Sequence, residues 1–268
     1  MSNAKVLFIS QEITPYSPET EISSISRYLP QGIQELGKEI RTFMPRFGKI
    51  NERRHQLHEV IRLSGMNLII NDADHPLIIK VASLQQARMQ VYFIDNEDYF
   101  HRKFVFSDEN DEFFKDNDER MIFFARGVLE TVKKLRWAPD IIHCHGWFTS
   151  LIPLYLKKAF QDDPLFQDSK IVYSLYDNDF NNTLDPKFSE KLHLKGVEKQ
   201  DVEMLDKPNF FNVSKMALNQ CDGIIIGTGN LDPKIYEYAK SLKKPLLENQ
   251  TEETFVNDYS NFYDELLK

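Results

Sequence analysis

Short apolar runs alternate with longer amphipathic segments along most of this chain. Six runs are typical of strands buried on both faces, because almost every position in them is apolar. Strands that alternate with helices pack as a parallel sheet that helices cover on both sides. The predicted strands span residues 5–10, 39–44, 91–95, 140–144, 171–175 and 223–228.

Two of the intervening segments have clear helical spacing. Residues 23–36 place their apolar side chains on one face, and Gly37 follows as a C-cap. The longest pattern covers residues 117–136, and Pro139 marks the exit into the next strand. Each helix precedes a predicted strand, as in the βα units of a doubly wound, Rossmann-like sheet, whose ligands bind at the carboxyl ends of the strands.

Two segments depart from this alternation. Residues 57–84 alternate in short runs, which predicts a small antiparallel decoration at the sheet edge. Residues 255–267 carry aromatic and leucine side chains at helical spacing, which predicts an amphipathic helix. We therefore expect an α/β fold with a single doubly wound parallel sheet over residues 1–245, and a C-terminal helix within 246–268 that docks on it.

Composition narrows the classes of partner. The chain has 268 residues, 41% hydrophobic and 28% charged, which suits one large globular domain or two small ones. A net charge of -8 without a basic stripe argues against nucleic acid or an anionic membrane as partner. The sequence has no apolar run of the roughly 18 to 20 residues that span a bilayer, and no signal-peptide pattern, so we expect a cytoplasmic protein.

Cysteine and histidine positions give little sign of metal chemistry. Cys144 and Cys221 are far apart, so they form neither a disulfide framework nor a four-ligand zinc site. His143 and His145 share one face of a strand, but no carboxylate has matching spacing, so strand packing is favoured over a metal site. We expect no metal and no cofactor.

A second histidine pair admits two interpretations. His55 and His58 are spaced by about one helical turn beside Arg53 and Arg54. Such a basic cluster suits an anion, although a solvated surface helix has the same pattern.

Longer motifs carry a family resemblance. Residues 5–50 resemble the opening of bacterial glycogen and starch synthases, whose first strand is followed by S-S-E-x-x-P-F-x-K-T-G-G-L-x-D-V-x-x-x-L-P. VYFIDNEDYFHRKFVF at 91–106 and DNDERMIFFARGVLETV at 116–132 resemble two further family segments. The matched positions, which include Asp95 and Arg102, are mostly structural, and we expect those two side chains to form a solvated ion pair.

The resemblance implies the N-terminal half of a two-domain, GT-B type glycosyltransferase that transfers glucose from ADP-glucose to an α-1,4-glucan. The family's K-T-G-G, which meets the sugar nucleotide, corresponds here to Pro18, Glu19, Thr20 and Glu21. Glycines let backbone N–H groups approach a phosphate, and lysine adds countercharge. Proline has no N–H, and two carboxylates repel an anion, so the donor loop is replaced.

The segment DIIHCHGWFTSLIPLYLK at 140–157 resembles the family's D-V-x-H-x-H-D-W-H-T-x-L-x-P-x-x-L. The family's Asp is Gly146 here, and its histidine that contacts the transferring glucosyl unit is Phe148, which cannot donate a hydrogen bond. In the next strand, another family histidine is Tyr176 and an asparagine is Asp177. No catalytic group of the family is retained at the positions that Pro18, Thr20, Glu21, Phe148 and Tyr176 occupy.

Two functions stay open at this stage. We expect a stand-alone, truncated homologue, since the roughly 40 residues after 223–228 are too few for a second sheet domain. It would lack transferase activity by itself and act as a binding, regulatory or oligomeric module with a protein partner or a second copy. The alternative is an active synthase that needs a complementing domain. Weak binding of a glucan or nucleotide sugar fits either, because aromatic faces stack on sugars, and the candidate residues are Tyr16, Arg46, His145, Trp147 and Asp177.

Overall fold

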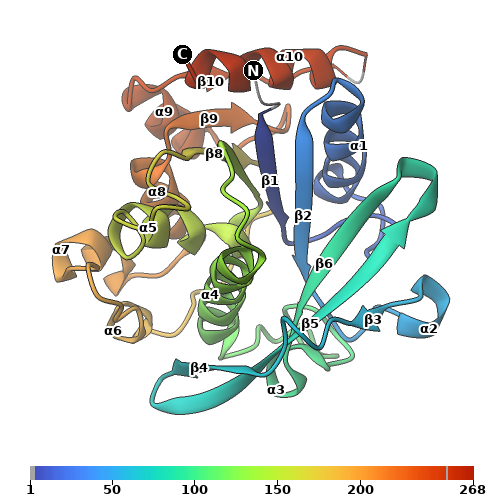
Figure 1. Cartoon of the computed structure of the whole chain (residues 1–268). Coiled ribbons are helices and arrows are strands. Elements are labelled where there is room, and N and C mark those ends of the chain that lie inside the picture. Colours follow the sequence, from blue (N-terminus) through green and yellow to red (C-terminus); the bar gives the residue numbers. More distant parts are fainter. Residues whose placement is uncertain (1–3, 252) are drawn as a thin grey trace.

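The computed structural model describes residues 4–251 and 253–268. Within them, the strands form one sheet in the order β10-β9-β8-β7-β1-β2-β6-β5-β3, and β4 pairs with β5 (Figure 1). All pairs from β10 to β6 are parallel, and β5 pairs antiparallel with β3, β4 and β6. The strands are β1 (Lys5–Ser10), β2 (Glu39–Pro45), β3 (His58–Glu59), β4 (Met66–Ile70), β5 (Ala73–Leu84), β6 (Met89–Asp95), β7 (Ile141–His145), β8 (Lys170–Leu175), β9 (Gly223–Ile226) and β10 (Leu246–Leu247).

The predicted fold class is confirmed. Each of the six expected strands forms, and their order reverses direction at β1 as in a doubly wound sheet. The expected antiparallel decoration is the β3–β5 region at one edge. The sequence pattern did not predict β10, because a strand of two residues is too short to show a period.

Helices cover both faces of the sheet (Figure 1). On one face, α1 and α10 pack on Val6, Phe8, Ile141 and Val172. On the other face, α4, α5 and α8 bury the larger part of the core. The helices are α1 (Glu21–Glu35), α2 (Glu52–His55), α3 (Glu97–Phe100), α4 (Asn117–Leu135), α5 (Leu151–Lys158), α6 (Phe188–Lys191), α7 (Lys199–Val202), α8 (Phe210–Gln220), α9 (Pro233–Ser241) and α10 (Phe255–Leu266).

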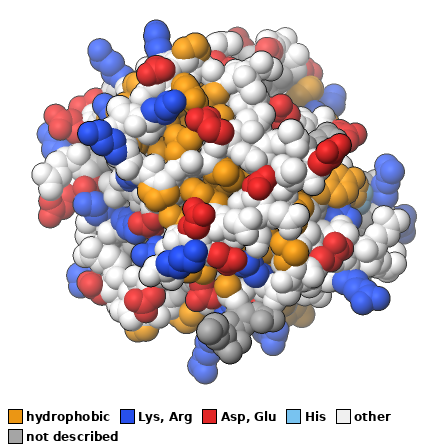
Figure 2. Space-filling model, turned by 90° about the horizontal axis from the view of Figure 1, so that it is seen from above, with side chains coloured by type: hydrophobic (Ala, Val, Ile, Leu, Met, Phe, Trp, Pro, Cys, Tyr) orange, Lys and Arg blue, Asp and Glu red, His pale blue; other side chains and the backbone are white. Residues whose placement is uncertain are grey.

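The C-terminal helix α10 lies against α1 and the sheet. Its Tyr259, Phe262 and Tyr263 are buried, and Lys38 reaches Asp264 at 3.0 Å from the end of the α1–β2 connection. Figure 2 views this side of the molecule and shows hydrophobic side chains gathered near its middle, among Asp and Glu. The helix thus forms and docks, while a domain boundary at residue 245 stays a prediction. Among the described residues, no helix is long and apolar enough to cross a membrane.

Close contact between α1 and α10 depends on Gly32. A methyl group at this position would lie 2.6 Å from Cγ1 of Val256, closer than carbon atoms can approach. The missing side chain of Gly32 therefore sets how near α10 can come to α1.

We expect Gly32→Ala to destabilise the protein although alanine favours helices by about 1 kcal/mol, because overpacking costs about 1–3 kcal/mol. The same change in a Val256→Ala background should be neutral or stabilising, since the clash is gone. Urea unfolding of the four proteins of this double-mutant cycle measures the difference. An equal effect of Gly32→Ala in both backgrounds would show that the two helices do not meet at this point.

Candidate functional site

The carboxyl ends of β1 and β7 define the candidate site. These strands are neighbours at the point where the strand order reverses, and Ser10 pairs with His145. The loop after β1 leads to α1, and the turn after β7 leads through Trp147–Thr149 to α5. Open α/β sheets bind their ligands at this position.

Gly146 lets the two loops approach each other. Its φ is 84°, in a region that favours glycine, and a Cβ there would collide with the side chain of Gln11. The side-chain oxygen of Gln11 accepts a hydrogen bond from the Phe148 backbone N–H at 3.2 Å. An aspartate, which the family motif has here, would therefore not fit beside Gln11 in this arrangement.

The N-terminus of α1 is capped by the chain itself. The Thr20 hydroxyl accepts from the Ser23 N–H at 3.0 Å, and the Ser23 hydroxyl accepts from the Thr20 N–H at 2.8 Å. The Thr20 hydroxyl in turn donates to a Glu12 carboxylate oxygen at 2.9 Å. Helix N-termini attract anions through free backbone N–H groups. Here the capping box already binds some of the N–H groups at the start of α1.

Carboxylates surround this helix start. Glu12 is half-buried beside Thr20, while Glu19 and Glu21 are exposed. Pro18, at the position of the family's lysine, is exposed and contributes no N–H. An incoming phosphate would meet three negative charges and no lysine of the donor loop.

Two buried histidines lie in the second half of β7, next to the site. His143 is fully buried, and its Nδ1 and Nε2 lie 2.7 Å from the Tyr263 hydroxyl and 2.6 Å from the Ser174 hydroxyl. His145 is also fully buried, with Nδ1 2.7 Å from the Tyr176 hydroxyl. The two rings, on one strand face as predicted, have centroids 3.9 Å apart. Residues of β7, β8, the loop after β8 and α10 thus contact one another, and Nε2 of His145 is the one ring nitrogen of the pair without a hydrogen-bond partner among the described residues.

Burial keeps both imidazoles neutral. Loss of hydration, together with the neighbouring His145, lowers the pKa of His143 well below its ordinary value. Burial lowers the pKa of His145 to about 3. Burial likewise raises the pKa of Tyr176 and of Tyr263 well above the ordinary value. These groups do not supply a charge near pH 7. Across residues 4–251 and 253–268, no three His, Cys, Asp or Glu side chains are placed to hold a metal ion.

The two aromatic residues after β7 lie in the core. Phe148 is fully buried, with its ring centroid 5.9 Å from that of Phe47 and 5.3 Å from that of Phe106. Trp147 is 3% exposed, and rings of Phe106 and Phe180 lie within 4.8 Å and 4.7 Å of it. In this arrangement Trp147 offers no open ring face for a sugar.

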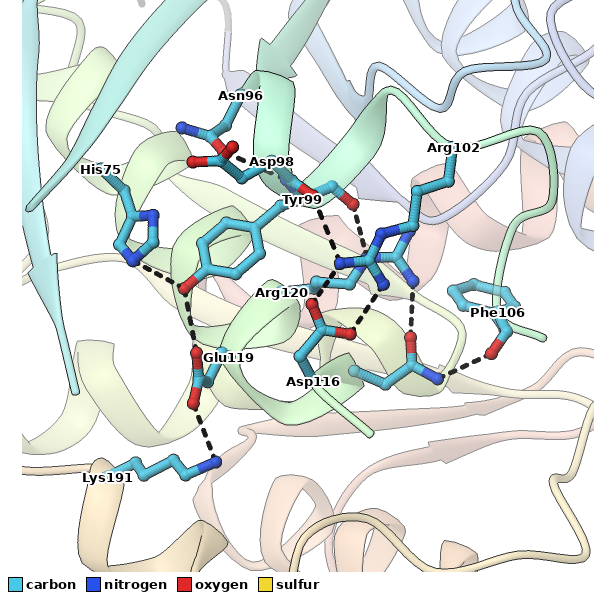
Figure 3. A network of polar contacts seen from close by, with 11 residues as sticks. His75, Asn96, Asp98, Tyr99, Arg102, Phe106, Asp116, Glu119, Arg120 and Lys191 are labelled. Carbon is cyan, nitrogen blue, oxygen red and sulfur yellow. Dashed lines mark hydrogen bonds and ion pairs between the residues drawn. The ribbon is translucent and has the colours of Figure 1, made fainter. Parts of the chain in front are cut away.

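A polar network holds the loop that carries Phe106 (Figure 3). Arg102 forms a two-pronged ion pair with Asp116, and Arg120 donates to the Tyr99 carbonyl at 2.8 Å and to Asn117 at 2.5 Å. Asn117 donates to the Phe106 carbonyl at 2.9 Å. Most of these residues belong to the family-like motifs at 91–106 and 116–132. The motifs therefore position Phe106, whose ring packs against Trp147 and Phe148.

One expected ion pair is wrong. Asp95 and Arg102 do not pair, because Arg102 turns to Asp116. The fully buried Asp95 carboxylate instead lies 2.9 Å from both Lys80 and His101. Sequence separation alone did not show that β5 would bring a lysine beside β6.

The remaining candidates do not gather in one place. Tyr16 is buried against Phe93. Arg46 forms an ion pair with Glu52, which also binds Lys80. Asp177 is exposed in the loop after β8. Two cavities border the start of α1: one of about 210 Å³, lined by the loop after β1 with Glu12 and Tyr16 and by Phe47, Lys49 and Phe106, and one of about 630 Å³, whose lining includes Glu19 and Glu21. Ligand binding by Tyr16, Arg46, His145, Trp147 and Asp177 stays a prediction.

These features define the class of the protein: a doubly wound α/β domain of the GT-B glycosyltransferase type. The structure is similar to the catalytic domain of Starch Synthase IV from Arabidopsis thaliana bound to ADP and acarbose, with a TM-score of 0.74 and 16% sequence identity. The match covers 93% of this chain and 52% of that one. At this level of sequence identity, the match shows a common fold only.

The chain belongs to the starch synthase catalytic domain family, whose model matches residues 5–227. It is 40% identical over 193 residues to a glycogen synthase of Chlorobium luteolum, covering 71% of this chain and 39% of that protein. It is 37% identical over 209 residues to a glycogen synthase of Chlorobaculum tepidum, covering 73% of this chain and 42% of that protein. The chain thus spans about two fifths of the length of these relatives, and the predicted resemblance is confirmed.

Sequence reasoning missed what closes the site. Tyr263 of α10, 120 positions after His143, completes the histidine network. The capping box of Thr20 and Ser23 was in principle readable, because serine or threonine at the N-cap with a polar side chain at N3 is its signature.

Removing the buried hydroxyl of Tyr263 tests the histidine network. We expect Tyr263→Phe to lower the free energy of unfolding by about 1–3 kcal/mol, because His143 would lose a partner without access to water. Tyr236→Phe on α9 is the matched control, since its hydroxyl bond to Glu248 is exposed and should be worth less than about 0.5 kcal/mol. Urea unfolding gives both values, and equal losses would contradict the network.

The buried histidines also predict a pH dependence. Their folded-state pKa values are lowered, so below about pH 6.5 the unfolded chain takes up protons that the folded chain does not. Stability should be fully present above that pH and be lost as the pH falls toward the folded-state pKa of about 3 for His145. Each histidine contributes up to about 1.4 kcal/mol per pH unit. His145→Gln should therefore flatten the slope measured by urea unfolding between pH 7 and pH 5, and an unchanged slope would contradict the argument.

Proposed function

We propose that this starch-synthase-type domain does not transfer glucose by itself and instead acts as a binding module for a protein partner or a second copy. One observation carries the proposal. The helix start that corresponds to the family's donor loop is capped by Thr20 and Ser23 and flanked by Glu12, Glu19 and Glu21. Phosphate binding there requires free N–H groups and positive charge, and the loop provides carboxylates.

The position of the family's glucosyl-contacting histidine supports the same proposal. Phe148, at the position of the family's glucosyl-contacting histidine, is fully buried among aromatic rings. A buried phenyl ring neither donates a hydrogen bond nor stabilises a developing charge. Transfer would therefore need a replacement group, and Asp177 is the first of two exposed carboxylates, with Asp179, in the loop after the neighbouring strand.

The face formed by α1 and α10 supports an interaction role. Large hydrophobic side chains are exposed on it, with Tyr28 at 54%, Leu36 at 49% and Leu267 at 37%. Figure 2 shows hydrophobic side chains grouped on this side. Contiguous exposed apolar surface commonly marks a contact with another protein.

A second candidate function rests on the identity to whole synthases. In this second proposal the chain joins a complementing domain and uses ADP-glucose and an α-1,4-glucan; its 40% identity over 193 residues to a glycogen synthase supports it. Substrate binding separates the two proposals, because a synthase half must still recognise the donor or the acceptor.

Calorimetric titration with ADP-glucose, UDP-glucose and a maltooligosaccharide provides the test. We expect no donor binding at concentrations up to about 1 mM, which corresponds to less than about 4 kcal/mol of binding free energy. A combined variant with Pro18→Lys, Glu19→Thr, Thr20→Gly and Glu21→Gly should bind ADP-glucose more tightly than the parent, because it removes two carboxylates and adds a cation.

Light scattering on the same sample measures the assembled mass. A defined oligomer, or a stable complex with a partner, supports the interaction role. Micromolar binding of ADP-glucose by the unmodified chain would overturn the proposal and favour the synthase that needs a complementing domain.

A further inference from the structure

A second pocket lies away from the strand-end site, between α1, α2 and the turn that joins β5 to β6. Its volume is about 480 Å³, within the range of small-molecule sites. Figure 1 shows α1, α2 and the β5–β6 hairpin on the same side of the molecule. We call it the Arg27–Arg54 pocket, and its walls include Thr14, Tyr16, Arg27, Tyr28, Arg54 and His55.

The charge of this pocket differs from that of the whole chain. The chain carries a net charge of -8, yet no Asp or Glu is among the residues that line the pocket. Within the described part of the chain, neither Arg27 nor Arg54 forms an ion pair with a carboxylate. A concave surface lined by one sign of charge concentrates the opposite ion.

Arg27 is the less accessible of the two cations. It is 8% exposed, and its Nη1 donates to the side-chain oxygen of Gln31 at 2.8 Å. The guanidinium carbon lies 5.3 Å from the centroid of the Tyr28 ring. A guanidinium has five N–H donors, and a nearly buried one is costly unless an anion or several acceptors satisfy it. Gln31 accepts from one of these donors and the Tyr28 ring packs against the guanidinium, so the other N–H groups face the pocket without a carboxylate partner.

Tyr16 and His55 complete the wall next to Arg54. Their rings meet edge to face with centroids 5.0 Å apart. Burial and the neighbouring Arg54 lower the pKa of His55, so at neutral pH its ring is an uncharged N–H donor. The pocket therefore offers two permanent cations and neutral donors.

An adjoining cavity extends the basic surface. It has a volume of about 460 Å³, shares Ser83, Leu84 and Gln85 with the first pocket, and adds Arg41 and Arg88. Its one lining carboxylate, Glu39, accepts a hydrogen bond from Trp137 at 2.5 Å. The arginines thus follow one continuous surface around the β5–β6 turn.

From this geometry we propose that the Arg27–Arg54 pocket binds the phosphate group of a small phosphorylated metabolite. Arginine presents paired N–H groups that match phosphate oxygens, and the volume accommodates a metabolite rather than a polymer. The acidic remainder of the surface disfavours a long polyanion. Of the basic cluster seen in the sequence, Arg54 and His55 line the pocket, whereas His58 lies in β3.

The site is next to the loop that replaces the family's donor loop. Thr14, Pro15 and Tyr16 line the pocket and immediately precede residues 17–20. Ser17, Pro18 and Thr20 instead line the 210 Å³ cavity on the other side of this segment. A phosphate in the Arg27–Arg54 pocket would contact the middle of α1 rather than its first turn, although Tyr16 borders both cavities.

Neighbouring arginines on α2 provide a matched test. Arg53 and Arg54 are both exposed, but only Arg54 lines the pocket. Inorganic phosphate and ribose 5-phosphate are titrated into the full chain by calorimetry at fixed ionic strength, with ribose as the uncharged control. We expect saturable binding of both phosphates, about tenfold weaker in Arg54→Gln, which is the size of a lost charge-assisted hydrogen bond. Arg53→Gln should change the affinity by less than about twofold.

Thermal unfolding of the three proteins confirms that each variant is folded. Two results would overturn the proposal: the unmodified chain binds neither phosphate, or Arg53→Gln weakens binding as much as Arg54→Gln. The second result would mean that phosphate senses only general surface charge. Because ADP-glucose also carries phosphates, its titration is repeated with Arg54→Gln. Binding lost in that variant belongs to the Arg27–Arg54 pocket, whereas binding that persists belongs to the start of α1 and counts against the proposed function, so the two failures are distinguishable.

Discussion

The hydrogen bonds of the two histidines inside β7 tie neighbouring elements together: both ring nitrogens of His143 and Nδ1 of His145 have partners, while Nε2 of His145 has none among the described residues. His143 and His145 have no access to water, so each needs partners from neighbouring elements. β8 supplies Ser174, the residue after β8 supplies Tyr176, and α10 supplies Tyr263. Docking of the C-terminal helix is therefore tied to the buried face of β7, because undocking α10 would leave Nδ1 of His143 without a partner.

The same principle explains why the site at the sheet reversal does not look ready for a ligand. Thr20 and Ser23 cap α1 for each other, Gln11 binds the backbone at Phe148, and Trp147 is enclosed by aromatic rings. An active site normally holds donors and acceptors in reserve for the substrate. Here the family frame is kept, and the polar groups that line it are largely used within the chain.

Two arginines without a carboxylate partner lie at the Arg27–Arg54 pocket, whereas Lys49 is the cation that lines the 210 Å³ cavity beside the start of α1. The contrast is electrostatic: carboxylates gather at the start of α1, whereas the pocket beside α2 has arginines and no carboxylate. Both places border the loop between β1 and α1. The proposed phosphate pocket therefore lies away from the first turn of α1, where the family motif places the donor. The two sides of the loop between β1 and α1 differ in charge.

The sequence by itself determined six strands of the parallel sheet and the two long helices, since buried strands and helical faces leave periods that are local in the chain, and its motifs determined the family. It also identified the substituted loop at Pro18–Glu21 by its residue types alone. Tertiary structure decided what could not be local: that Tyr263 meets His143, that Asp95 pairs with Lys80 rather than Arg102, and that Trp147 is enclosed. These contacts join residues distant in the chain, and hydrophobic periodicity states which face is buried but not which partner buries it.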